Sequence, residues 1–211
     1  MAFPRRIARV AAGLALALVA ACGQKPAAVG AAPGAMSLGS ADAKVTLVEY
    51  ASTTCPHCKN FHLEVLPRIK KDYVETGKVR YTFREYPTPP TQVAVAGMLT
   101  ARCAGEAKYF QVLDVLFDQQ EEIVVAAQGG GARQALLTIA RQAGLTEEQF
   151  TACLSDTQAL EAINASVTEA EKAGVVGTPT LFVNGRRIEQ RPAAEYSYED
   201  VKTALDAALA G

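Results

Sequence analysis

The sequence predicts one α/β domain whose sheet-forming halves are separated by a long helical insertion. Three observations carry this prediction. A β-branched run ends at a Cys-Pro-His-Cys segment, helical periodicity occupies about eighty residues in mid-chain, and a strand, an Asn-Gly turn and an amphipathic helix close the sequence. The 211 residues, 49% of them hydrophobic, are sufficient for such a domain and exclude a disordered chain.

The charge balance excludes one class of partner. The chain carries 21 basic and 22 acidic residues, a formal net charge of -1. A nucleic-acid-binding domain needs a strongly cationic surface, which this composition does not supply. We therefore expect no nucleic-acid partner.

The first 21 residues have the pattern of an export signal. Three arginines precede an apolar run over residues 10–21, which is too short to span a bilayer comfortably. The small residues before Cys22 resemble a bacterial lipobox, so we expect cleavage to leave Cys22 first and lipidated. The alternative is an ordinary signal peptide with Cys22 incidental. Residues 22–43, rich in Ala, Gly and Pro, are expected to form a flexible tether.

The domain begins with a predicted strand over residues 45–50 and a helix that starts near Cys55. We expect Pro67 to kink this helix and Gly77 to end it before a second strand over residues 78–86. Residues 44–90 and 175–211 are thus assigned to one domain, and residues 91–174 to a helical insertion.

The insertion shows helical periodicity over residues 93–103, 109–117, 135–143 and 160–171. Thr146 to Gln149 have the pattern of a capping box that begins another short helix, and three glycines at 129–131 indicate a loop. Sheet structure resumes with a strand over residues 178–183. Asn184-Gly185 predicts a hairpin leading into residues 186–190, and the final helix is expected over residues 197–210.

The Cys-x-x-Cys segment carries the chemistry. Unpaired N–H groups and the helix dipole favour a thiolate at a helix N-terminus, so Cys55 is the expected nucleophile. Pro56 suits the first helical turn, and His57 adds a polar or cationic neighbour. Cys58, one turn further along, is the expected resolving cysteine. Because a stable thiolate is a good leaving group, the pattern favours donation of a disulfide to other proteins.

On these residues the chain resembles the DsbA-like branch of the thioredoxin superfamily, from Lys44 to the C-terminus. The resemblance implies a thioredoxin fold with an inserted α-helical subdomain. It also implies that Pro179 follows a cis peptide bond and faces the active site, beside Thr178, as part of a substrate-binding surface. Threonine at position 178 also occurs among related disulfide isomerases, so an isomerase or reductase remains the alternative to an oxidase.

Glu49 lies six residues before Cys55, where this family often keeps a buried acid that exchanges protons with the resolving cysteine. Burial among apolar residues is expected to raise the pKa of this carboxyl towards the range useful for proton transfer. The alternative is an exposed glutamate on a strand edge.

Two further groups of residues have competing interpretations. His62 could join Cys55 and Cys58 in a copper or zinc carrier site, although a structural role is the favoured interpretation. Cys103 and Cys153 are expected to form a second, structural disulfide, because export favours oxidation; two buried free thiols are the alternative.

Together these expectations describe a monomeric, membrane-anchored periplasmic lipoprotein of a Gram-negative bacterium, held to the membrane by the lipid on Cys22. It would oxidise exported cysteine-containing proteins and be reoxidised by a membrane partner. The Cys55–Cys58 disulfide is the redox group, and no separate cofactor or metal is expected.

Overall fold

The computed structural model describes Met1, residues 34–190 and residues 195–211. The predicted signal peptide after Met1, Cys22 and most of the predicted tether lie outside these residues. In the described part of the chain, no helix combines the length and apolar character needed to cross a bilayer.

The centre of the molecule is a mixed five-stranded sheet in the order β1-β3-β2-β4-β5. Its strands are β1 (Met36–Leu38), β2 (Val45–Ala51), β3 (Val79–Glu85), β4 (Thr180–Val183) and β5 (Arg186–Arg187). β2 and β3 pair in parallel, from Val45 opposite Val79 to Ala51 opposite Glu85, and the other three pairings are antiparallel. This is an α/β fold with both central strands buried.

Strand β1 corrects the predicted extent of the tether. The tether was expected to reach residue 43, but Met36–Leu38 pair with Tyr81 to Phe83 on the edge of β3. The side chains of Met36 and Leu38 also pack against the core. A three-residue edge strand inside an Ala- and Gly-rich segment is too short to show the alternation that predicts a strand.

The first helical segment runs without a break from Pro56 to Val74 but changes its winding. It consists of α1 (Pro56–Asn60), η1 (Phe61–Val65), α2 (Leu66–Ile69) and η2 (Lys70–Val74), of which η1 and η2 are π-helical. The N–H of Leu66 bonds to the carbonyl of Phe61, so a wide turn immediately precedes Pro67, which has no N–H to donate. Gly77, with a φ of 73°, ends the segment, as predicted.

Six helices form the insertion between β3 and β4. They are α3 (Thr91–Cys103), α4 (Glu106–Asp118), α5 (Gln120–Gln128), α6 (Ala132–Gln142), α7 (Glu147–Cys153) and α8 (Thr157–Lys172). The predicted capping box at Thr146 and the glycine loop before α6 are confirmed. α5 was not predicted, because its short sequence carries few buried residues and a weak apolar face.

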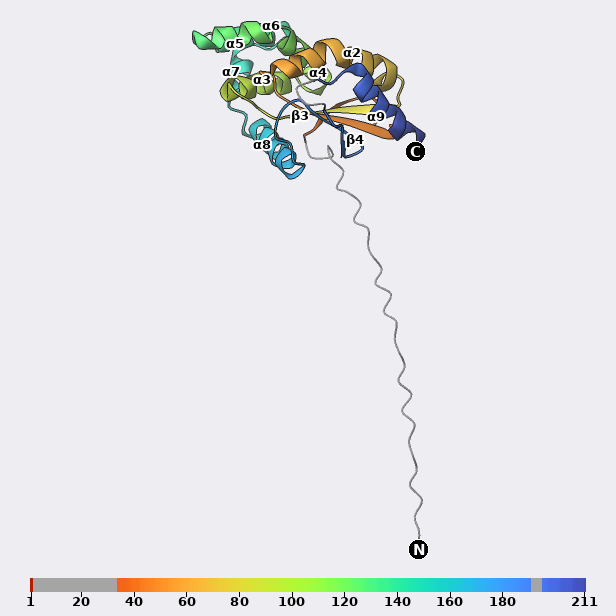
Figure 1. The fold of residues 1–211 in the computed structure, drawn as a ribbon. Coiled ribbons are helices and arrows are strands. Elements are labelled where there is room, and N and C mark those ends of the chain that lie inside the picture. The colour runs from red at the N-terminus through yellow and green to blue at the C-terminus, as the bar shows by residue number, and fades with distance from the viewer. Residues whose placement is uncertain (2–33, 191–194) are drawn as a thin grey trace.

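The two faces of the sheet meet different helices (Figure 1). The helix from α1 to η2, together with α4 and α9 (Tyr198–Ala210), covers the face formed by Leu47, Ala51 and Phe83. α8 covers the opposite face, where Ala170 packs with Val48 and Tyr50. Because side chains alternate along a strand, Glu49 falls on the same face as Leu47, below the start of α1. This alternation places an acidic residue under the Cys-Pro-His-Cys segment.

The C-terminal hairpin and helix were predicted closely. Asn184 and Gly185 both have positive φ and form a two-residue turn, but β5 stops at Arg187 instead of reaching residue 190. Ser197 caps α9 through a capping box with Asp200, at the predicted start of this helix.

Candidate active site

Cys55 lies at the N-terminus of α1, where the chain turns from β2 into the helix. Its backbone is extended, and its sulfur accepts the N–H of Cys58 at 3.4 Å, so the nucleophile itself acts as the N-cap. Pro56 occupies the first helical position, as predicted. The strand, the turn and the helix start thus place this sulfur where backbone N–H groups converge.

The surroundings of Cys55 favour its thiolate. Together these surroundings lower the pKa of Cys55 from 9.0 to about 6; the largest cause is a hydrogen bond with the side chain of Cys58, and burial opposes it. The backbone N–H groups of Cys58 and His57 contribute to this lowering. Cys55 is therefore largely ionised at neutral pH when the pair is reduced.

Cys58 has the opposite character. Its side chain is fully buried, and burial is the main reason that the pKa of Cys58 is raised well above 9.0. The charges of Cys55 and Glu49 raise this pKa further. The two thiols are both free in this structure, and their pKa values differ in the directions expected of a nucleophile and a resolving thiol.

Thr178 and Pro179 face Cys55 from the loop before β4. The peptide bond between them is cis, as the resemblance implied, and the Cys55 thiol donates to the Thr178 carbonyl at 3.2 Å. A second cis bond, which no pattern in the sequence indicated, joins Pro89 and Pro90. The Thr178 contact shows that a main-chain group lies beside the nucleophile.

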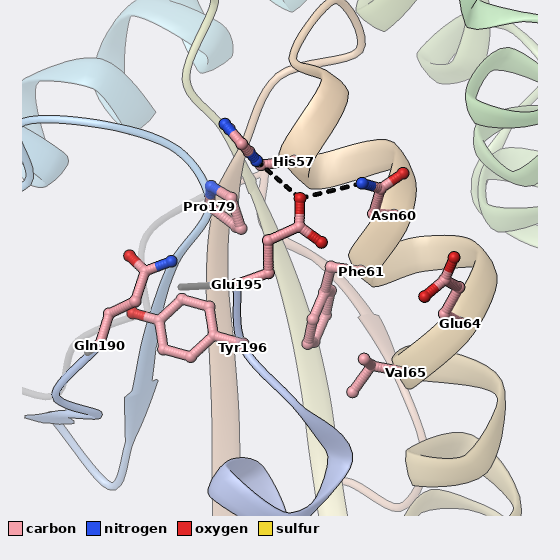
Figure 2. A pocket seen from close by; sticks show the side chains of 9 residues that line it. All are labelled: His57, Asn60, Phe61, Glu64, Val65, Pro179, Gln190, Glu195 and Tyr196. Carbon is pink, nitrogen blue, oxygen red and sulfur yellow. Dashed lines mark hydrogen bonds and ion pairs between the residues drawn. The ribbon is translucent and has the colours of Figure 1, made fainter. Parts of the chain in front are cut away.

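His57 is held by a residue that sequence reasoning missed. Figure 2 shows the Glu195 carboxylate between His57 and Asn60, where one oxygen accepts from both at 2.7 and 2.9 Å. This hydrogen bond is the largest cause of the raised pKa of His57, and it lowers the pKa of Glu195. These groups line a pocket of about 30 Å³ that also borders Pro179. No sequence signal links Glu195 to a site 138 residues earlier in the chain.

A second unpredicted residue fixes the loop before Cys55. The buried Gln120 amide donates to the carbonyls of Thr53 and Cys55, both at 3.0 Å. The Thr53 hydroxyl donates in turn to the carbonyl of Ala94 in α3. The helical insertion therefore holds the active-site loop directly.

Glu49 is fully buried, as expected for the acid beneath the cysteines. The hydroxyl of Tyr81 donates to Glu49 Oε2 at 2.5 Å, and His62 Nε2 lies 3.1 Å from the same oxygen. The other oxygen, Oε1, has no hydrogen-bond partner among the described residues. His62 thus belongs to a polar cluster under the active site and lies beside Glu49.

Cys103 and Cys153 are joined by a disulfide, with their Cα atoms 6.0 Å apart. Both residues end their helices, α3 and α7, so the bond ties together two elements of the insertion. Within the ranges that the structure describes, no three His, Cys, Asp or Glu side chains are grouped to hold a metal ion. The alternative metal carrier therefore has no assembled ligand set there.

Comparison with known proteins places this geometry in a family. A family model described as thioredoxin matches residues 31–207. The crystal structure of Wolbachia pipientis alpha-DsbA1 superimposes with a TM-score of 0.74 and 25% identity, covering 85% of this chain and 92% of that one. The chain is a DsbA-like member of the thioredoxin family. BdbD from Bacillus subtilis shares the fold of this DsbA-like chain, with a TM-score of 0.72, 23% identity and coverage of 84% and 94%.

Curated relatives of the DsbA-like chain carry names of the same kind. A putative protein-disulfide oxidoreductase of Rickettsia bellii is 34% identical over 178 residues, which cover 82% of this chain and 64% of the relative. A probable disulfide bond formation protein D of Bacillus anthracis is 30% identical over 179 residues, with coverage of 82% and 77%. The DsbA-like chain spans less than two thirds of the length of the rickettsial relatives that it matches.

Proposed function

We propose that this protein is a thiol:disulfide oxidoreductase that oxidises cysteine pairs of exported proteins. The observation that carries the proposal is the position of Cys55 at the N-terminus of α1, where its sulfur accepts the N–H of Cys58 at 3.4 Å beside the buried Cys58 side chain. This arrangement lowers the pKa of Cys55 to about 6. A stabilised Cys55 thiolate favours the reduced pair, so the oxidised pair readily passes its disulfide to another dithiol. The names of the relatives support the same reaction class.

The proposed reaction begins on the oxidised protein. A substrate thiolate attacks Cys55 Sγ, the Cys55–Cys58 bond breaks, and its electron pair leaves on Cys58. A second substrate thiolate then attacks the substrate sulfur of the mixed disulfide and releases Cys55 as a thiolate. The substrate loses two electrons and gains a disulfide, and Cys58 takes up a proton because burial favours its neutral form. Glu49, buried on the same side of the sheet, is the proposed proton donor.

Thr178 and Pro179 are the proposed substrate contacts. The carbonyl of Thr178 already holds Cys55, and the pocket beside Pro179 borders His57. A substrate segment bound here would lie with its cysteine next to Cys55. The predicted export signal and lipobox support a periplasmic protein anchored through Cys22, with a membrane partner that reoxidises it.

The reduction potential of the Cys55–Cys58 pair tests the direction of electron flow. Equilibration with glutathione buffers should give a potential above that of the glutathione couple, because the Cys55 thiolate stabilises the reduced form. A potential below that of glutathione would instead identify a reductase.

Single cysteine variants test the roles of the two sulfurs. Cys55→Ser should abolish exchange, whereas Cys58→Ser should accumulate mixed disulfides on Cys55, which mass spectrometry detects. Equal trapping by both variants would contradict the assignment.

A further inference from the structure

The proposed reaction leaves Cys58 with a problem of proton access. Cys58 and Glu49 are both fully buried, yet Cys58 must gain a proton when the substrate is oxidised and lose it when the protein is reoxidised. Neither side chain reaches solvent directly. Some group must connect Glu49 with the surface in each half of the cycle.

Only two side chains hydrogen-bond to Glu49 among the described residues, Tyr81 and His62. Burial and the charge of Glu49 raise the pKa of Tyr81 well above its usual value, so this hydroxyl keeps its proton and serves as a fixed donor. The imidazole of His62 is different, because it can accept a proton on one nitrogen and release one from the other.

The edge of the His62 ring that points away from Glu49 lies close to a solvent-exposed carboxylate. Its Nδ1 has no hydrogen-bond partner within the part of the chain that the structure describes, and it lies 4.0 Å from Asp114 Oδ1 of α4. The His62 side chain is 1% exposed and the Asp114 side chain 51% exposed, so this short gap separates the interior from solvent. Lys70 of η2 holds Asp114, with both carboxylate oxygens 3.2 Å from its ammonium group.

Three phenylalanine rings contact the His62 ring. Phe117 stacks on His62 with ring centroids 4.0 Å apart, and Phe61 and Phe83 meet it edge-on. Among the described residues, the titratable groups that the imidazole nitrogens face are Glu49 from β2, Tyr81 from β3 and Asp114 from α4. These phenylalanine contacts fix the plane of the His62 ring, with Nε2 directed towards Glu49 and Nδ1 towards Asp114.

We infer that His62 passes protons between Glu49 and Asp114, and so connects the buried Cys58 thiol with solvent. The inference rests on the proposed exchange at Cys55 and Cys58. During reoxidation, Cys58 gives its proton to Glu49, Glu49 protonates His62 Nε2, and the proton on Nδ1 leaves towards Asp114. During substrate oxidation every transfer runs in reverse, from Asp114 through Nδ1 and Nε2 to Glu49 and Cys58.

This alternation removes the usual difficulty of a histidine relay. One passage of a proton exchanges the protonated nitrogen, and a one-way relay must then turn the ring or exchange its protons to start again. Here each half of the redox cycle restores the tautomer that the other half consumed. The ring can therefore stay stacked on Phe117 throughout the cycle.

Reoxidation of the full chain by oxidised glutathione separates the relay from the rest of the chemistry. Cys55 attacks one glutathione sulfur, and the first glutathione leaves as a thiolate. Cys58, after losing its proton, attacks Cys55 Sγ and the second glutathione leaves, so two thiols are oxidised and one glutathione disulfide is reduced. Acid quenching and mass spectrometry follow the Cys55 adduct, and iodoacetamide reports the first nucleophile alone.

His62→Gln keeps a side chain that can hydrogen-bond to Glu49 but cannot relay a proton. We expect the resolving step to slow about 100-fold, near the lower limit for a positioned proton-transfer group, while the pH profile of Cys55 alkylation stays unchanged. His62→Ala should show the same slow step and regain speed when imidazole is added. Asp114→Asn should slow the step, whereas the matched control Asp118→Asn, on the exposed face of the same helix, should not.

The outcomes distinguish the relay from its alternatives. Resolution of the adduct by His62→Gln at the wild-type rate would overturn the relay. A parallel change in Cys55 alkylation would also overturn it, because a merely structural His62 would disturb both steps. If Cys55 forms no glutathione adduct even in Cys58→Ser, which cannot resolve it, the proposed function itself fails.

Discussion

At the scale of single residues, the site depends on neighbouring groups that shift the pKa values of two cysteine side chains in opposite directions. Cys55 and Cys58 are three positions apart, yet the pKa of one is lowered to about 6 and that of the other is raised well above 9.0. The hydrogen bond with the Cys58 side chain, followed by the N–H groups at the helix terminus, explains the lowered pKa of Cys55, and burial explains the raised pKa of Cys58. Their positions in the strand-to-helix turn thus determine which sulfur attacks.

Glu195 offers a test of how His57 is held. Glu195→Gln should lower the pKa of His57, because the hydrogen bond to this carboxylate is the largest cause of its raised value. NMR titration of the two histidines measures this shift. Glu64→Gln is the matched control, since Glu64 lines the same pocket but makes no hydrogen bond to His57. An unchanged His57 titration in Glu195→Gln would show that this ion pair is absent in solution.

Some residues of the site could be predicted from the sequence, and others could not. Cys55, Cys58 and Pro179 were identified from a motif and from a resemblance, and the burial of Glu49 followed from an apolar strand pattern. Glu195 and Gln120 were missed because their partners lie 138 and 65 residues away, and such contacts leave no local pattern. His62 was assigned a structural role because periodicity does not show which polar group a buried ring will face.

At the scale of secondary structure elements, the insertion supports the active-site loop. The N-terminus of α5 presents Gln120 to two loop carbonyls, and α3 accepts a hydrogen bond from Thr53. A loop that carries a nucleophile needs such support, because small displacements of a reacting group are costly. The element that the sequence did not predict, α5, is therefore one that positions Cys55.

Replacement of Gln120 tests this support. Gln120→Met keeps the length of the side chain but removes the hydrogen bond to the Thr53 carbonyl and one of the two bonds to the Cys55 carbonyl, which still accepts the N–H of Lys59. We therefore expect a loss of about 1–3 kcal/mol in the free energy of unfolding. Denaturant titration measures this loss. Gln128→Met, at the exposed end of the same helix, should change stability little. Equal stability of the two variants would mean that water satisfies the loop carbonyls as well as Gln120 does.

The Cys103–Cys153 disulfide gives a second prediction at this scale. The bond closes a loop of 50 residues, so Cys103→Ala/Cys153→Ala should lose about 4 kcal/mol of stability in the chain-entropy account. Exchange at Cys55 should persist, because the bond supplies no reacting atom. Thermal unfolding and glutathione exchange on the same samples measure the two properties. Loss of exchange at a temperature where the variant is folded would show that this disulfide influences the active site.

At the scale of the whole molecule, the elements that carry strong local sequence patterns could be predicted, whereas those that depend on contacts with the rest of the fold could not. Strands β2, β3 and β4 and the helix α9 carry strong local patterns, since each buries one face or both. Edge strand β1 and helix α5 are stabilised chiefly by tertiary contacts: β1 pairs with β3, and Gln120 of α5 bonds to the active-site loop. Their existence depends on the assembled fold, which a single sequence does not display.

At this scale the charge on Cys55 links redox state, pH and stability. The pKa of Cys55 is lower in the folded protein, about 6, than its ordinary value of 9.0. The reduced protein therefore binds fewer protons when folded than when unfolded between these values, and its stability increases as the pH rises through this window. Below about pH 6 the thiolate is protonated and this contribution is lost. The oxidised protein has no Cys55 thiol and lacks the contribution at every pH.

This link can be tested by guanidinium unfolding of both redox forms at about pH 5 and about pH 8. Between these two pH values, the free energy of unfolding of the reduced form should increase by about 2–3 kcal/mol relative to that of the oxidised form. Other titrating groups are common to both forms, so the difference isolates the cysteine pair. Cys58 does not oppose the gain in this window, because its raised pKa keeps it neutral and its ordinary ionisation begins only near 9.0. The reduced Cys55→Ser variant should lose the effect. If the two forms keep a constant difference in stability across this range, the Cys55 thiolate does not stabilise the reduced fold, and it cannot be what makes the disulfide oxidising.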